Sequence, residues 1–115
     1  MSRNVIKIKS FDFAVDIVYL YKELVSKHKE YVMSRQILKS GTSIGANVRE
    51  AEFAISKPDF INKMTISLKE ANETDYWLDL IYRTSYIDEI EYNRFKTKIE
   101  EILKLLVSIV KSSKR

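Results

Sequence analysis

Apolar residues recur at intervals of three and four positions through most of this 115-residue chain. That interval is the period of an amphipathic α-helix and not of a β-strand. It predicts four helices, over about residues 11–29, 34–55, 58–85 and 89–111. Because four long helices joined by short connections pack as antiparallel neighbours, we expect an all-α protein, a single up-down antiparallel four-helix bundle over residues 1–115 with short basic ends.

Local signals mark several of the predicted helix ends. Ser10 is a suitable N-cap for the first helix, since Asp12 follows near the positive end of the helix dipole. Pro58 fits the first turn of the third helix and disfavours helical angles in the residue before it. Asp88, with Glu91 three residues later, resembles a capping box for the fourth helix.

The same spacing predicts the inward faces. Gly41 and Gly45 lie one turn apart on the second helix, where two small residues let a neighbouring helix approach closely and so compensate for their low helix propensity. The first predicted inward stripe comprises Ala14, Ile17, Val18, Tyr21, Leu24 and Val25, and the second comprises Ile37, Ile44, Val48, Ala51 and Ile55. The third comprises Phe60, Met64, Ser67, Ala71, Thr74 and Leu78, and the fourth comprises Phe95, Ile99, Ile102, Leu103, Leu106, Ile109 and Val110.

Composition narrows both the fold and the compartment. Two glycines and one proline are too few for a β fold rich in hairpins. The absence of cysteine excludes disulfides, thiolate metal sites and cysteine nucleophiles. No apolar run approaches the ~20 residues of a membrane span and no signal peptide is recognisable, so we expect a cytoplasmic protein with no membrane partner.

Catalytic and metal-binding groups are scarce. The only histidine, His28, lies among lysines near the end of the first predicted helix, where a solvated side chain is expected. Glu50, Glu70 and Glu73 are the carboxylates that an inward metal centre would use, but such centres in bundles also contain Glu-x-x-His motifs, which this chain lacks. We therefore expect no enzyme activity, no metal and no cofactor.

The net charge of +4 is unevenly distributed. The two ends of the chain hold bases without acids, and the part between them is slightly acidic. Basic ends can follow a phosphate backbone, and they can also serve only as solubilising tails, so both uses stay open. The candidate nucleic-acid-binding residues are Arg3, Lys7, Lys9, Lys104, Lys111, Lys114 and Arg115.

A polar stripe lies beside the apolar stripe of the second predicted helix. Its residues either fix the register of two helices through hydrogen bonds or form a face that binds a partner or ligand. The stripe comprises Gln36, Ser40, Ser43, Asn47 and Glu50, and the residues placed to meet it on the third helix are Ser67, Glu70 and Thr74.

Several aromatic residues do not fit the inward stripes, and some of them should lie on outer faces. Outward aromatic side chains are typical of protein interfaces, so we expect self-association, with base stacking as the competing use. The residues concerned are Phe11, Phe13, Phe53, Tyr76, Tyr86 and Tyr92.

Three segments, 43–51, 57–60 and 67–78, carry a resemblance to a known family. They read Ser-Ile-Gly-Ala-Asn-Val-Arg-Glu-Ala, Lys-Pro-Asp-Phe and Ser-Leu-Lys-Glu-Ala-Asn-Glu-Thr-Asp-Tyr-Trp-Leu. Together they resemble the four-helix bundle family named after a protein encoded in intervening sequences of bacterial 23S ribosomal RNA. The family pattern often reads Ser-Ile-x-x-Asn-Ile-x-Glu-Gly, from which Val48 and Ala51 depart.

The resemblance implies a bundle that assembles into a ring or barrel, commonly a homopentamer. A related protein, the accessory variability protein of diversity-generating retroelements, binds nucleic acid and a reverse transcriptase through a basic surface, which makes RNA, DNA and such a protein candidate partners here. The resemblance also implies structural roles for the motif residues Ser43, Asn47, Glu50, Glu70, Glu73 and Trp77.

Two functional hypotheses follow. In the first, the chain is a non-enzymatic homo-oligomeric scaffold that engages nucleic acid or a ribonucleoprotein through its basic ends. In the second, it is a protein-only adaptor that holds a protein partner through aromatic and acidic helix faces. A hydrolase built on the three glutamates is the least favoured alternative, because proton shuttles and metal ligands are missing.

Overall fold

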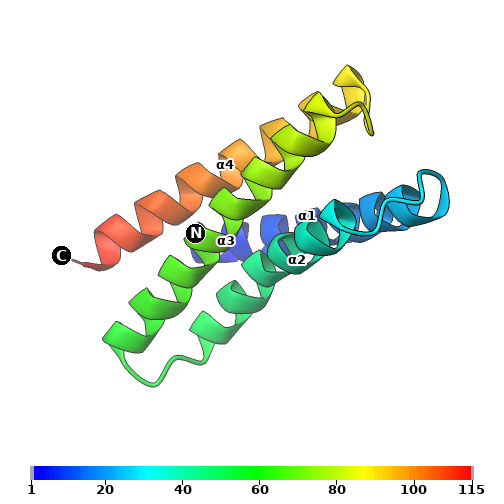
Figure 1. Ribbon diagram of the computed structural model, residues 1–115. Helices are drawn as coiled ribbons and strands as arrows, with labels where there is room; N and C mark the ends of the chain where they lie inside the picture. Colours follow the sequence, from blue (N-terminus) through cyan, green and yellow to red (C-terminus); the bar gives the residue numbers. More distant parts are fainter. Residues whose placement is uncertain (1, 115) are drawn as a thin grey trace.

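The computed structural model describes residues 2–114, with side chains for residues 4–114. It contains helices α1 (Ser2–Ser26), α2 (Met33–Glu52), α3 (Lys57–Arg83) and α4 (Glu89–Ser113). Each helix packs on the next one in the chain, and α1 also packs on α4, while the diagonal pairs are not in backbone contact over the described residues. The protein is therefore an up-down antiparallel four-helix bundle, as predicted (Figure 1).

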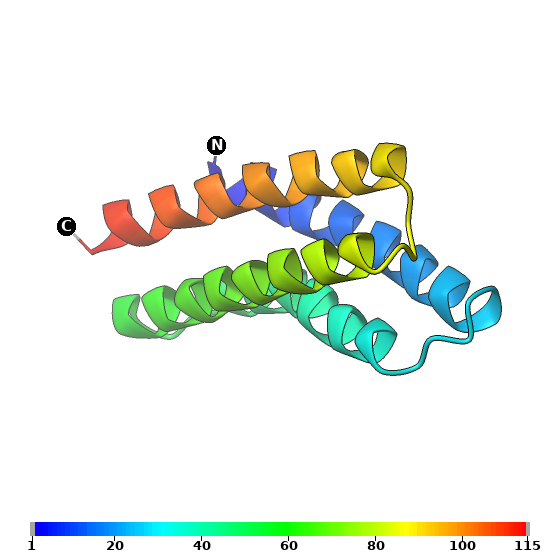
Figure 2. The same cartoon turned by 45° about the horizontal axis from the view of Figure 1, so that its top comes forward.

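The bundle has two distinct ends. Both chain termini and the α2–α3 connection lie at one end, and the α1–α2 and α3–α4 connections lie at the other (Figure 2). We call the first the terminal end and define it as residues 2–9, 49–63 and 101–114. We call the second the distal end and define it as residues 21–35 and 79–94.

The core runs along the bundle axis and is mostly aliphatic. Two phenylalanines, Phe13 of α1 and Phe95 of α4, are fully buried and meet edge to face with ring centroids 6.0 Å apart. The inward stripes predicted for α3 and α4 are largely buried, including Met64, Leu78 and Ile99.

The structure corrects the bounds of the first helix. The helix begins at Ser2 rather than near residue 11, and it ends at Ser26 rather than at 29. Ser10 is not an N-cap: it is fully buried inside α1, and its hydroxyl donates to the Lys7 carbonyl at 3.3 Å. Because Ile6 is also fully buried, the apolar period continues ahead of Ser10 and outweighs its capping preference.

The inward stripe of α1 is also rotated from the predicted one. Phe13 and Leu20 are buried, whereas Ala14 and Tyr21, one position later, are only half-buried. The spacing allowed either choice because α1 carries apolar residues on two faces.

The two glycines of α2 lie where α1 comes closest, which confirms the prediction of a close helix approach. A Cβ on Gly41 would lie 2.8 Å from the Ile17 side chain, and one on Gly45 would lie 3.3 Å from the Ser10 carbonyl group. A small residue at position 10 is needed for the same reason.

The remaining helix ends follow local hydrogen bonds. The second helix ends at Glu52, not at 55, and Ile55 is 94% exposed in the connection, so its predicted place in the core is wrong. The Ser56 hydroxyl accepts from the Asp59 N–H at 3.2 Å at the start of α3. Asp88 Oδ1 accepts from the Glu91 N–H at 2.8 Å, as the predicted cap of α4 requires.

The start of α2 is capped by an acidic residue from the preceding connection. The Glu30 carboxylate accepts from the backbone N–H groups of Val32, Met33 and Ser34 at 2.7–3.1 Å. Burial raises the pKa of Glu30, but these donated hydrogen bonds outweigh it and lower the pKa below its ordinary value. None of the helices, as far as they are described, is long and apolar enough to cross a bilayer.

Candidate nucleic-acid interface

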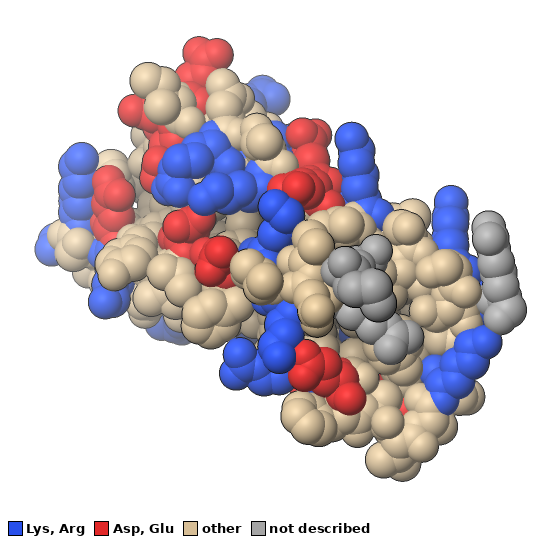
Figure 3. All heavy atoms as spheres, turned by 180° about the vertical axis from the view of Figure 1, so that it is seen from behind, with Lys and Arg blue, Asp and Glu red and all other residues tan. Residues whose placement is uncertain are grey.

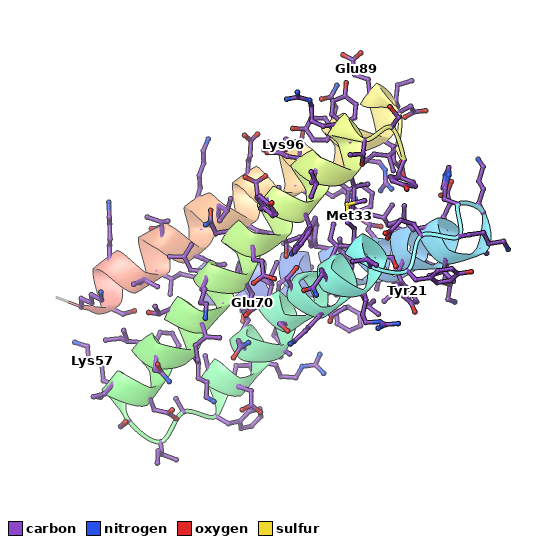
Figure 4. All side chains as sticks on the ribbon, viewed as in Figure 1. Tyr21, Met33, Lys57, Glu70, Glu89 and Lys96 are labelled. Atoms are coloured by element: carbon purple, nitrogen blue, oxygen red, sulfur yellow. The ribbon has the colours of Figure 1, made fainter. Side chains whose placement is uncertain are left out.

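Folding gathers the basic ends of the chain at the terminal end and adds bases that sequence reasoning did not include. The α2–α3 corner brings Arg49, Lys57 and Lys63 to the same end as the termini. Lys57 projects from the first turn of α3 on the side where α4 ends (Figure 4). Their signal in the sequence is the antiparallel topology itself, which requires the middle connection to lie beside both termini.

The two ends differ in charge. By sequence, the terminal end holds nine Lys and Arg against four Asp and Glu, a formal charge of +5. The distal end holds six of each. Figure 3 shows Lys and Arg side chains projecting at the right of the view with few acidic ones between them, whereas the two signs intermingle at the left. The surplus positive charge is therefore localised.

Lys7 and Lys9 are not parts of a loose tail, as the sequence suggested, but lie inside α1. Lys7 pairs with Glu52 of α2 at 2.8 Å, and Lys9 pairs with Glu101 of α4 at 3.1 Å. Each pair joins two helices across a half-exposed surface. These two lysines are therefore partly neutralised at rest.

Lys104, Lys111 and Lys114 are exposed and have no carboxylate within 4.0 Å among the described residues. Lys104 and Lys111 flank Val107 along a shallow groove of about 570 Å³ on the outside of α4. These three bases form the part of the candidate interface that is free to bind. Arg3 lies in α1 with its side chain outside the described set, and Arg115 lies outside the described residues.

Near the distal end, by contrast, a basic residue is held inside the bundle surface. Lys96 of α4 bonds Asp75 at 2.7 Å and Asp79 at 3.2 Å, both on α3 (Figure 4). Burial lowers the pKa of Lys96, but the two carboxylates outweigh it and raise the pKa well above its ordinary value. The Tyr92 hydroxyl also donates to Asp79, at 2.6 Å, and this bond raises the pKa of Tyr92.

A pocket of about 780 Å³ opens at the distal end, between the end of α1 and the α3–α4 connection. Its lining mixes the acids Glu23, Asp88 and Glu91 with the bases Lys27 and Arg83, so charges of both signs meet there. His28 is half-buried there, with its ring edge to face on Tyr86 at 5.5 Å, rather than fully solvated as predicted.

The polar contacts predicted between α2 and α3 form in part. The Thr74 hydroxyl donates to Ser40 Oγ at 2.9 Å, and the Ser67 hydroxyl donates to the Ile44 carbonyl at 2.8 Å. All three polar side chains are fully buried. They fix the register of the two helices, because each would lose a partner if the helices slid.

The outer members of the same stripe bond within their own helix. The Ser43 hydroxyl donates to the Lys39 carbonyl at 2.6 Å, and the Asn47 amide donates to the Ser43 carbonyl at 2.8 Å. Gln36 is exposed. The predicted network therefore shrinks to its buried members, and the rest of the stripe faces outward.

The motif glutamates do not face the core. Glu50 is exposed and pairs with Lys63 at 3.5 Å, and Glu73 accepts from the Trp77 indole N–H at 3.1 Å. Glu70 is half-buried on α3 (Figure 4), and its carbonyl accepts from Thr74. Among residues 4–114, no group of three or more His, Asp or Glu side chains is placed to hold a metal ion.

Of the aromatic residues that did not fit the predicted stripes, some lie in or against the core and others are exposed. Phe13 is buried, and Tyr86 and Tyr92 pack against the core from its edge. Phe11, Phe53 and Tyr76 are exposed. In addition, α1 carries a second, outward apolar stripe that sequence analysis missed, formed by Val5, Ile8, Phe11, Val15 and Tyr19.

Comparison with known proteins places this architecture. Residues 3–108 match the family described as 23S rRNA-intervening sequence protein. The crystal structure of a protein of unknown function from the S23 ribosomal protein family of Bacteroides thetaiotaomicron VPI-5482 is similar, with a TM-score of 0.95 and 61% identity. The match covers 96% of this chain and 99% of that one. No protein of curated function matches the chain.

Proposed function

Because the chain belongs to the 23S rRNA-intervening sequence protein family, we propose that it is a non-enzymatic homo-oligomeric scaffold that binds nucleic acid or a ribonucleoprotein. The observation that carries this proposal is the charge of the terminal end, +5 against zero at the distal end. A localised surplus of bases attracts a polyanion through release of its counterions and needs no catalytic group.

The lysines of α4 are the central contacts of the proposed interface. Lys104, Lys111 and Lys114 are spaced seven and three residues apart, which is about 10 and 5 Å along a helix axis at a rise of about 1.5 Å per residue. That spacing allows each ammonium group to reach a different phosphate. Lys7 and Lys9 would join them by exchanging Glu52 and Glu101 for phosphates.

The outward stripe of α1 supports self-association. A helix that is apolar on opposite faces is typical of one covered on both sides, and one face of α1 remains open in the single chain. The stripe runs from Val5 to Tyr19, a length of about 21 Å at a rise of about 1.5 Å per residue. A second copy of the chain is the occupant that we propose for it.

Asp12 constrains the geometry of that assembly. It is exposed midway between Val5 and Tyr19 and has no ion pair among the described residues. Any two-fold contact centred on the stripe would set two Asp12 carboxylates against each other, which is unfavourable. The stripe would therefore dock on a different surface of the next copy, and head-to-tail contacts of this kind form a ring when the rotation between copies closes. The pentameric ring implied by the family resemblance would then repeat the basic end and add its weak contacts together.

Size-exclusion chromatography coupled to light scattering tests both parts of the proposal. We expect a stable oligomer near five subunits, and a shift on adding a short structured RNA at low salt that disappears at moderate salt. Replacing Ile8 and Tyr19 by Glu should give a folded monomer, because both side chains are exposed; Val32 and Ile90 at the distal end serve as the matched control. A wild-type monomer indifferent to RNA contradicts the proposal.

A second candidate function is a protein-only adaptor. The outer face of α3 favours it: Tyr76 is exposed, and the Trp77 indole N–H donates to the Glu73 carboxylate. An aromatic and acidic surface suits a protein partner with a basic surface. Capture of a protein that survives nuclease treatment and fails after Tyr76→Ala would favour this function over the first.

A further inference from the structure

The four-residue connection between α2 and α3, residues 53–56, exposes two large apolar side chains at the tip of the terminal end. Phe53 is 78% exposed and Ile55 is 94% exposed. The Phe53 ring has no aromatic or cationic partner among the described residues. Neither side chain contributes to the core, so neither is explained by folding.

The backbone of this connection is held at both sides. The Phe53 N–H donates to the Glu50 carbonyl at 3.1 Å, and the Ala54 N–H donates to the Ala51 carbonyl at 3.2 Å. On the other side, the Ile55 N–H donates to Asp59 Oδ2 at 3.2 Å. Because these bonds fix the main chain, the ring is presented without a large loss of conformational entropy on binding.

Basic residues lie close to Phe53 in the chain. Arg49 lies one turn before Phe53, with its guanidinium over the Phe11 ring at 5.7 Å, and Lys57 follows at the start of α3. A pocket of about 480 Å³ beside the connection is lined by Ser56 and by Ser112 and Ser113 at the end of α4, which lie between Lys111 and Lys114 in the sequence. The neighbouring acids are engaged, since Glu52 pairs with Lys7 and Asp59 bonds the connection.

Unpaired nucleotides bind to protein surfaces on which an exposed aromatic ring lies near lysine and arginine side chains that contact phosphates. A base in a single strand can stack on the ring while lysine and arginine contact its phosphates, whereas the bases of a duplex are already stacked and closed to it. We infer that the terminal end binds single-stranded nucleic acid, with Phe53 stacking on an exposed base. This inference rests on the proposed function and specifies its ligand.

The distal end supplies a matched control. It also exposes an aromatic and an aliphatic side chain, Tyr31 at 51% and Ile90 at 82%, but its charge is balanced. If exposure alone created the site, the two ends would behave alike. If stacking of a nucleobase also needs lysine and arginine side chains nearby, replacing Phe53 should weaken binding and replacing Tyr31 should not.

The experiment measures binding of the full chain to a fluorescein-labelled 12-nucleotide RNA, single-stranded or annealed to its complement, by fluorescence anisotropy at low salt. Phe53→Leu keeps the apolar surface and removes the π face, so it should weaken single-strand binding about fivefold or more and leave duplex binding unchanged. Phe53→Tyr should bind like the wild type. Tyr31→Leu should change neither affinity, and thermal melting should show all variants equally folded.

The outcomes separate the inference from the proposed function. If the wild type binds neither RNA at low salt, both fail. If it binds both but Phe53→Leu retains single-strand affinity, or weakens both strands equally, the stacking inference alone fails. A further outcome would also overturn the stacking inference. In it, the wild type binds vesicles of anionic phospholipid, and Phe53→Ala abolishes that binding but leaves RNA binding unchanged, so the tip would be a membrane contact.

Discussion

The two ends of the bundle both expose large apolar side chains and differ in the balance of their charges. The terminal end holds the α2–α3 connection and the distal end holds the other two connections, and each end exposes an aromatic and an aliphatic side chain. At the distal end six bases are matched by six acids, and nearby Lys96 is held by two carboxylates of α3. At the terminal end three lysines of α4 have no acidic partner among the described residues. Lys29, Arg35 and Arg83 at the distal end likewise have no carboxylate within 4.0 Å among the described residues. Exposed apolar side chains and unpaired bases therefore do not distinguish the ends, and net charge does.

The largest expected effect is loss of nucleic-acid binding when the free lysines are neutralised. Replacing Lys104, Lys111 and Lys114 together by Gln should lower affinity roughly 100- to 1,000-fold at 0.1 M salt and make the slope of log affinity against log salt shallower by about 3. The measurement is a salt titration by fluorescence anisotropy. The control neutralises Lys29, Arg35 and Arg83, three distal bases that also have no carboxylate within 4.0 Å among the described residues. Equal loss in the two triple variants would remove the distinction between the ends.

Freeing Lys7 and Lys9 from their acidic partners should increase the nucleic-acid affinity of the terminal end. Glu52→Gln with Glu101→Gln frees Lys7 and Lys9, which can then add up to two phosphate contacts. We expect a steeper salt slope by up to about 2 and an affinity increase of about tenfold at 0.1 M salt. No increase would mean that the two lysines serve only to join α1 to its neighbours.

A third prediction concerns stability rather than binding. Lys96→Gln leaves Asp75 and Asp79 without their cation and should lower the free energy of unfolding by about 1–2 kcal/mol, while Lys111→Gln should leave it unchanged. Because the folded-state pKa of Lys96 is raised, its contribution is complete below the ordinary lysine pKa of about 10.4 and is lost as the pH rises further. Urea unfolding at neutral and alkaline pH measures both effects. Nucleic-acid binding of Lys96→Gln should stay at the wild-type level.

The smallest expected effect is at the distal cap of α2. Glu30→Gln should lower the free energy of unfolding at pH 7 by about 0.5–1 kcal/mol, because three backbone N–H groups lose a charged acceptor. The folded-state pKa of Glu30 is lowered, so the wild-type carboxylate stabilises the fold above its unfolded pKa of about 4.3 and loses this advantage as the pH falls below that value. The difference between the proteins should therefore narrow at pH 3.5. If the difference in free energy of unfolding between the two proteins is the same at both pH values, the charge of Glu30 does not contribute to the cap.

Sequence reasoning was accurate where a single periodic stripe decided the outcome. On α3 the positions from Met64 to Leu78 are buried as predicted, because that helix has only one apolar face. The reasoning failed on α1, where a second apolar face made two rotations equally compatible with the spacing, and Ser10 suggested a helix start inside a helix. A capping preference is worth about 1 kcal/mol, less than burial of Ile6 and the contacts around it.

For the candidate interface, the sequence identified the basic residues at the chain ends but not which of them pair with acidic side chains. Nothing local indicates that Lys7 and Lys9 pair with Glu52 and Glu101, which lie 45 and 92 residues away along the chain. The sequence also does not indicate that Phe53 lies at the same end of the bundle as the basic chain ends. The α2–α3 corner reaches that end only when the helices fold back on each other.

The sequence by itself determined the four helices, their antiparallel order and the uneven charge, since periodicity, short connections and composition act over a few residues at a time. Tertiary structure alone decided which face of α1 is buried, which lysines at the terminal end pair with acids, and which exposed aromatic residue lies at the end with surplus positive charge. These properties depend on distances between residues far apart in the chain, and packing of the core sets those distances.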